Sequence, residues 1–205
     1  QTLYFRQLFE LEKMLGWVRD GQRIHIKHGH YRFKDEKMST RKGNVIWMND
    51  VIDEAIKKAK KLGSNDIKLA KIVAIGALKY NDLKRDPKTE IVFDWNEILK
   101  MEGNSGPYLQ YTYARSKSVI HKANKVIFEI DKNIKLNEQE TSLLSTLLKF
   151  SDELIKASGI YSPNIVCTYL FDLASKFNTF YTKNKIIGSK NENFRLALTQ
   201  ATSHV

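Results

Sequence analysis

Three side chains that can hold an unpaired nucleic-acid base recur at helical spacing in the second half of the chain. They are Tyr108, Tyr111 and Arg115, and their spacing places them on one face of a helix. Aromatic rings and guanidinium planes both stack on bases. The pattern therefore predicts a surface for single-stranded RNA. The alternative is a face of tyrosines packed in the core with their hydroxyl groups hydrogen-bonded.

Two groups of residues could extend this surface. Asn104 and Gln110 can hydrogen-bond to RNA or merely cap the helix, and Tyr181 on a later helix is a weaker candidate for base stacking. The second group is a basic run earlier in the chain, at Lys57-Lys58 and Lys60-Lys61. A solvated helix face is its ordinary interpretation, and contact with RNA phosphates is the alternative.

A second polar cluster, KMSTRKG, occupies residues 37–43. Polar residues lead into it and a glycine closes it, so a mobile loop is predicted. A solvated basic turn is the ordinary interpretation of so short a cluster. The rest of the sequence has to decide whether this cluster has a function beyond that.

The composition favours an anionic partner. Among 205 residues, 34 are Lys or Arg and 23 are Asp or Glu, which gives a formal charge of +11. Such a surface suits nucleic acid before membrane, although charge for solubility is an equal alternative. The single cysteine, Cys167, excludes a disulfide framework and fits a reducing cytoplasm. No apolar run is long enough to cross a bilayer, and no metal site is expected.

The first part of the chain has the pattern that is typical of the end of an α/β unit. The expected elements are a helix over 4–15, a strand over 23–27, an extended segment over 45–48, and a helix that Asn49 or Asp50 caps and Gly63 ends. One apolar face of that helix contains Ile52, Ala55, Ile56 and Ala59.

The remainder is expected to be helical almost to the end. Ser64 or Asn65 is predicted to cap a helix whose apolar stripe holds Leu69, Ile72, Val73, Gly76 and Tyr80. Beyond the polar connection 82–90, helices are expected over 94–99, 107–125, 143–159, 162–180 and 193–204. The fold class is therefore mainly α: a remnant of an α/β unit followed by an all-α bundle.

Three stretches together resemble a known family. KMSTRKGNVIWMNDVIDEA resembles the second signature, KMSKS, of class I aminoacyl-tRNA synthetases. VAIGALKYNDLKRDPKTEIVFDWN and EGNSGPYLQYTYARSKSV are similar to one member of that class, arginyl-tRNA synthetase. The resemblance implies the end of a Rossmann catalytic domain over 1–62, a helical connecting region over 63–106, and an α-helical anticodon-binding domain over 107–205.

The resemblance also implies roles for individual residues. Lys37, Ser39 and Arg41 would be catalytic, and ATP would be held by Lys37, Met38, Ser39, Thr40, Arg41 and Lys42, with Tyr4 and Phe5 near the adenine. A buried helix start is the alternative for Tyr4 and Phe5. The tRNA-facing residues would be Asn104, Tyr108, Gln110, Tyr111, Arg115 and Tyr181. Thr40 stands where the signature has its second lysine, so Arg41, Lys42 or a lysine elsewhere must replace it.

The implied activity belongs to a longer protein. The parent would join arginine to its tRNA through an arginyl-adenylate, with Mg-bound ATP as substrate and no tightly bound cofactor expected in this part. The upstream HIGH signature does not occur in these residues, so we expect a carboxy-terminal fragment that is inactive alone. The expected partners are arginine-specific tRNA, ATP and arginine, and the expected state is a monomer. The alternative is a non-catalytic helical RNA-binding module.

Overall fold

The computed structural model describes residues 1–33, 47–61, 66–124, 130 and 133–205. The KMSTRKG cluster lies outside the described residues, as does Gly63, the predicted end of a helix. In chain order the elements are α1 (Thr2–Met14), β1 (Tyr31–Phe33), α2 (Met48–Lys61), α3 (Ile67–Leu83), β2 (Ile91–Phe93), α4 (Trp95–Ile98), α5 (Gly106–Ala123), α6 (Glu138–Leu148), α7 (Phe150–Gly159), α8 (Pro163–Lys183) and α9 (Glu192–His204).

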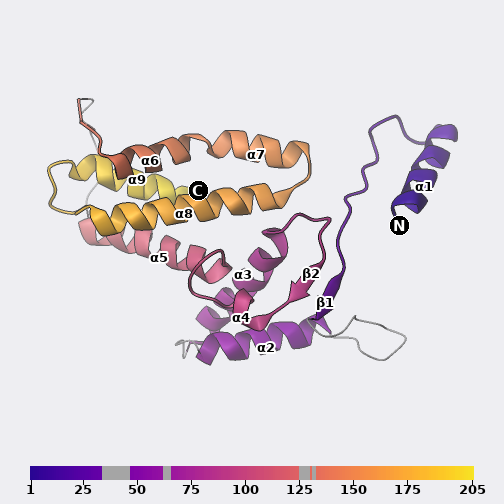
Figure 1. Ribbon diagram of the computed structural model, residues 1–205, viewed down its shortest axis with the longest axis horizontal. Helices are drawn as coiled ribbons and strands as arrows, with labels where there is room; N and C mark the ends of the chain where they lie inside the picture. Colours follow the sequence, from indigo (N-terminus) through magenta and orange to yellow (C-terminus); the bar gives the residue numbers. More distant parts are fainter. Residues whose placement is uncertain (34–46, 62–65, 125–129, 131–132) are drawn as a thin grey trace.

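The elements form a helical bundle and a smaller mixed part (Figure 1). Helices α5 to α9 make the bundle, while α2, α3 and α4 gather around the two short strands. Helix α1 lies apart at the far end of an extended connection, and no residue of it is buried. The mainly α fold class predicted from the sequence is confirmed.

The core of the bundle is built around α8. Leu173, Phe177 and Phe180 of this helix are buried, as the apolar stripe predicted. They pack against Leu143 of α6 and Leu196 of α9, both also buried. Each large apolar side chain removed from water stabilises the fold by about 1.5–3 kcal/mol, so α8 is the helix on which the others assemble.

Helices α2 and α3 pack through alanines. Ala55 and Ala59 of α2 meet Ala70 and Ala74 of α3 in a buried cluster. The α2 face was predicted correctly, and the α3 stripe was correct in part: Tyr80 is buried and Val73 packs against the alanine cluster, but the two other large apolar members are not buried. Leu69 and Ile72 are 49% and 62% exposed, because the close approach of two helices selects the face with the smallest side chains. The N-cap of α3 is Asp66, whose carboxylate accepts from Lys68 N, rather than Ser64 or Asn65.

The strands form a two-stranded parallel sheet. Residues 31–33 pair with residues 91–93, starting with Tyr31 opposite Ile91. The prediction of a strand over 23–27 was therefore wrong, and the strand at 91–93 was not predicted. A strand forms only where a second strand supplies hydrogen bonds. A strand of three residues is also too short to show a recognisable alternation of apolar and polar side chains. Met48, expected to be extended, begins α2, so Asn49 and Asp50 lie inside its first turn.

Local signals placed most of the other helices. Asp94 caps α4 through Asn96 N, and Ser105 caps α5, whose first turn holds a proline. The single helix expected over 143–159 is divided at Lys149 into α6 and α7. Asn137 and Glu140 form a capping box at the start of α6. No helix in the described ranges is both long and apolar enough to cross a membrane.

A glycine contact sets the crossing of α3 and α5. A Cβ atom on Gly106 would lie 2.7 Å from the carbonyl oxygen of Gly76 and 2.8 Å from the Cα of Ala77. Beside this crossing, Nε2 of Gln110 donates to the carbonyl of Ile72 at 3.1 Å. The start of α5 is thus held directly against the backbone of α3.

Replacing Gly106 with alanine is therefore expected to destabilise the chain. The new methyl group would meet backbone atoms that cannot rotate away, and overpacking of this kind costs about 1–3 kcal/mol. Urea unfolding followed by circular dichroism measures the loss. Gly159→Ala is the control, because a Cβ there meets nothing within 4 Å. Equal stability of the two variants would show that α3 and α5 do not depend on this contact.

Candidate nucleic-acid interface

Arg115 lies between two tyrosine rings at the junction of α5 and α8. Its Cζ is 4.5 Å from the ring centroid of Tyr111 and 4.8 Å from that of Tyr181. Its Nη2 also donates to the Tyr111 hydroxyl at 2.7 Å. The spacing on α5 had placed Tyr111 and Arg115 on one face, and the fold adds Tyr181 from a helix far along the chain. The three form one stacked unit.

Asn178 of α8 ties this unit to the rest of α5. Its Nδ2 donates to the Tyr108 hydroxyl at 3.0 Å and to Thr112 Oγ1 at 2.8 Å. Its Oδ1 accepts from Arg115 Nη1 at 2.5 Å. Sequence reasoning missed Asn178 and Thr112. The signal available was a polar residue next to the apolar stripe of α8, three positions before Tyr181.

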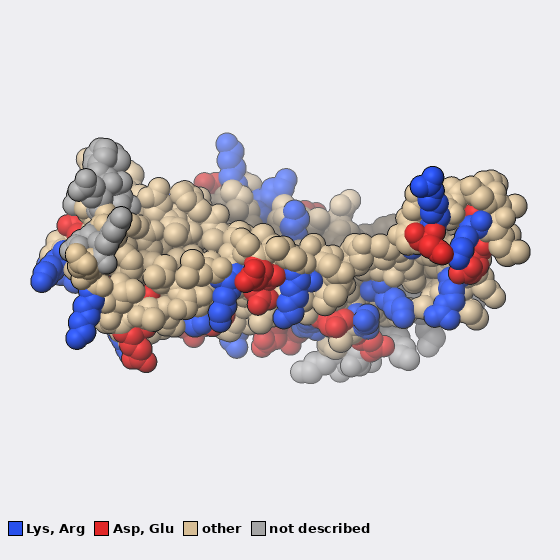
Figure 2. Space-filling model, turned by 90° about the horizontal axis from the view of Figure 1, so that it is seen from above, with Lys and Arg blue, Asp and Glu red and all other residues tan. Residues whose placement is uncertain are grey.

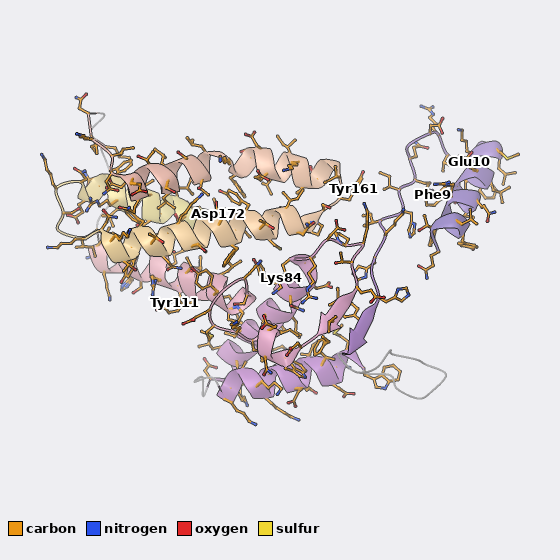
Figure 3. All side chains as sticks on the ribbon, viewed as in Figure 1. Phe9, Glu10, Lys84, Tyr111, Tyr161 and Asp172 are labelled. Atoms are coloured by element: carbon orange, nitrogen blue, oxygen red, sulfur yellow. The ribbon has the colours of Figure 1, made fainter. Side chains whose placement is uncertain are left out.

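The aromatic members differ in how much surface they offer. Tyr111 is 49% exposed and Tyr181 is 40% exposed, and Figure 3 shows Tyr111 on the outside of the bundle. Tyr108 is half-buried, with its ring centroid 5.8 Å from that of Phe171. The free stacking surface is therefore made by Tyr111 and Tyr181. Arg115 contributes charge and holds the rings in place.

An open groove of about 760 Å³ adjoins this stacked unit. Its lining includes Tyr111, Arg115 and Tyr181 together with the exposed Lys122 and Lys185. The described residues along it contribute three cationic side chains and no carboxylate. A groove that combines aromatic surface with unopposed positive charge can take a base and its phosphate. Elsewhere the charge is more mixed: Figure 2 shows Lys and Arg along the whole visible face with Asp and Glu among them.

Asn104 and Gln110 lie toward α3 rather than in the groove. Asn104 is exposed, its Oδ1 is 2.6 Å from the Tyr80 hydroxyl, and its carbonyl accepts from Lys84 Nζ at 2.8 Å. Burial lowers the pKa of the Lys84 ammonium group. The Tyr80 hydroxyl also reaches the carbonyl of Cys167 on α8, at 3.0 Å. These contacts place Asn104 and Gln110 where the bundle meets the mixed part of the molecule.

The two aromatic residues at the start of α1 have different surroundings. Tyr4 is exposed, and Phe5 is half-buried with its ring centroid 4.4 Å from that of His25. Neither the exposed ring nor the Phe5–His25 contact identifies a ligand. The residues expected to hold the ATP phosphates, Lys37 to Lys42, lie outside the described residues. Within the described part of the chain, no group of three or more His, Cys, Asp or Glu could hold a metal ion.

Comparisons with known proteins assign the two halves of the chain. Residues 109–205 match the family described as the DALR anticodon binding domain. Residues 1–95 match the family described as tRNA synthetases class I (R), catalytic domain. The chain belongs to the arginyl-tRNA synthetase family. It joins the C-terminal part of the catalytic domain to the helical anticodon-binding domain, as the resemblance implied.

Individual relatives and solved structures agree. An arginine–tRNA ligase of Clostridium botulinum is 33% identical over 217 residues, covering 100% of this chain and 38% of the relative. One from Fusobacterium nucleatum is 35% identical over 207 residues, covering 95% of this chain and 36% of the relative. The chain thus spans little more than a third of the length of these relatives.

Two solved structures have the same fold. The arginyl-tRNA synthetase of Thermus thermophilus superposes with a TM-score of 0.78 at 27% identity, covering 87% of this chain and 32% of that one. The enzyme of Plasmodium falciparum gives a TM-score of 0.81 at 25% identity, covering 100% of this chain and 36% of that one. The likeness extends over both the mixed part and the bundle.

Proposed function

We propose that this chain supplies the anticodon-binding face of an arginine–tRNA ligase and the segment, KMSTRKG, that contacts ATP. The parent enzyme joins arginine to its tRNA through an arginyl-adenylate formed from Mg-bound ATP. The observation that carries the proposal is the stacked unit of Tyr111, Arg115 and Tyr181, beside a cationic groove in the domain that matches the anticodon-binding family. The proposed domains are residues 1–62, 63–106 and 107–205.

Anticodon bases are unpaired and can leave the loop to stack on protein rings. The exposed faces of Tyr111 and Tyr181 take such bases, and each stacked base contributes about 1–3 kcal/mol. Arg115, Lys122 and Lys185 neutralise the adjoining phosphates. Tyr108 supports this face from α5. Asn104 and Gln110 lie outside the groove, and we propose that they contact the RNA beside it, on the side of α5 that faces α3.

The segment KMSTRKG is proposed to act on the other substrate. Expulsion of pyrophosphate from ATP builds negative charge on phosphoryl oxygens, which ammonium, guanidinium and hydroxyl donors stabilise. Lys37, Ser39 and Arg41 supply these donors, Met38, Thr40 and Lys42 complete the contact with ATP, and Tyr4 and Phe5 lie near the adenine. Arg41 or Lys42 takes over the charge that Thr40 lacks.

A free-standing RNA-binding module is the second candidate. Such a module would need the groove between α5 and α8 but no segment related to a catalytic domain. The match of residues 1–95 to the class I catalytic family favours the ligase. Both candidates bind RNA in the groove and neither predicts activity of these 205 residues alone, so the match of the first part of the chain to a catalytic family is what separates them.

Recognition of the anticodon tests the proposed RNA-binding role. We expect the chain to bind an arginine tRNA at least about 10-fold more tightly than the same tRNA with its anticodon replaced, because only unpaired bases of the right shape fill the groove. Fluorescence anisotropy at one fixed salt concentration measures both affinities. The isolated anticodon stem–loop should compete for the same site. Equal affinity for the two tRNAs would exclude anticodon recognition.

A second prediction concerns catalysis by these 205 residues alone. They contain no HIGH signature, so we expect no arginine-dependent exchange of pyrophosphate into ATP, with or without tRNA. A full-length arginyl-tRNA synthetase in the same assay is the positive control. Exchange above the arginine-free background would show that nucleotide activation needs less of the catalytic domain than we propose.

A further inference from the structure

The orientation of the Asn178 side chain is determined by its neighbours. The Thr112 hydroxyl donates to the carbonyl of Tyr108 at 2.9 Å, so it meets Asn178 as an acceptor. The amide nitrogen of Asn178 must therefore point at Thr112, and it reaches the Tyr108 hydroxyl as well. This leaves the amide oxygen directed at Arg115, the position in which it accepts the guanidinium hydrogen. An apolar side chain at this position could make none of these bonds.

The bond to Asn178 is one of two hydrogen bonds that hold the Arg115 guanidinium between the rings. An arginine side chain has about 2 kcal/mol of rotamer entropy, which it keeps if its end group is not held. Asn178 holds Nη1 while the Tyr111 hydroxyl holds Nη2, so both ends of the guanidinium are fixed. A binding surface fixed before the ligand arrives loses less entropy on association.

We propose that Asn178 is a positioning residue for RNA recognition: it orients Arg115 between Tyr111 and Tyr181 and thereby presents both rings in the geometry that unpaired bases meet. Asn178 acts through Arg115 and is not itself required to touch RNA. Thr112 shares the role one step further away, by setting which way the amide faces. The inference rests on the proposed function, since it explains how the groove recognises bases.

A double-mutant cycle tests the inference in the full 205-residue chain. Asn178→Ala is expected to weaken binding of the anticodon stem–loop by about 10-fold, and Arg115→Ala by at least as much. If Asn178 acts through Arg115, the double variant binds no more weakly than Arg115→Ala alone. Losses that multiply in the double variant would show two independent contributions and would overturn the inference.

A second variant and a control guard against a folding defect. Thr112→Val keeps the side-chain volume, and we expect a loss of about 3-fold that also vanishes in the Arg115→Ala background. Thr179→Ala is the control on α8, because its exposed hydroxyl donates to the carbonyl of Ser175 in its own helix. A weakening by Thr179→Ala equal to that of Asn178→Ala would attribute the effect to α8 as a whole and overturn the inference.

Nitrogen-15 spectra of the arginine side chains give a readout that needs no RNA. A distinct, slowly exchanging Arg115 signal is expected in the wild type and in Thr179→Ala, and an averaged signal in Asn178→Ala. An unchanged Arg115 signal in Asn178→Ala overturns the inference while leaving the proposed function intact. If the wild type binds no stem–loop, the proposed function is wrong and the RNA part of the inference falls with it.

Discussion

Replacing Tyr111 and Arg115 together with alanine is expected to weaken binding of an arginine tRNA by about 100-fold or more. The double change removes one exposed stacking ring and the cation that separates it from Tyr181. Stacking contributes about 1–3 kcal/mol per base, and a charge-assisted phosphate contact adds to this. Fluorescence anisotropy at constant ionic strength measures the change, because the affinity of any cationic surface for RNA varies with salt.

The same helix provides a matched control. Tyr113 and Lys117 form a second tyrosine–cation pair at the same spacing, with Lys117 Nζ 5.6 Å from the ring centroid, and Tyr113 is also exposed. The pair is shifted by two residues, so it lies on the other side of α5. Alanine at both positions removes a ring and a charge but should weaken binding by less than about 3-fold. Equal losses for the two pairs would mean that RNA binds α5 through charge alone.

Arg195→Ala is expected to lower the free energy of unfolding by about 3–5 kcal/mol, since it leaves a buried carboxylate unpaired. The Glu140 side chain is 1% exposed, and its Oε1 accepts from Arg195 Nε at 2.8 Å. Arg195 Nη1 also donates to the carbonyl of Lys185 at 2.7 Å. The residue thus joins α9, α6 and the segment that borders the groove. Urea unfolding monitored by circular dichroism gives the free energy.

Two further variants separate the buried pair from surface charge. Lys156→Ala removes the cation of an exposed pair, 3.9 Å from Glu153, and should change stability by no more than about 1 kcal/mol. Glu140→Leu combined with Arg195→Met should recover part of the loss, since no buried charge is then left unpaired, while the Asn137 N–H and the Lys185 carbonyl still lose their side-chain partners. If Arg195→Ala is as stable as Lys156→Ala, the pair does not hold α6 to α9.

Much of the helical fold could be predicted from the sequence because its signals are local. The cap at Asp94, the Ser105–Pro107 start of α5, and the apolar stripe of α8 each lie within a few turns of the helix that they define. The shared face of Tyr108, Tyr111 and Arg115 followed from spacing alone. The family was predicted from three separate stretches, each continuous in the sequence, and is confirmed by the comparisons. The roles of Lys37, Ser39 and Arg41 stay predictions.

Other features depended on residues that meet only after folding. The pairing of β1 with β2, the alanine face of α3 and the break at Lys149 have no sufficient signal in their own segments. In the candidate site, the sequence determined which residue types share a face of α5. The tertiary structure alone brought Tyr181 and Asn178 to that face. Helical spacing orders neighbours along one helix, whereas contacts between helices are set by the packing of the whole core.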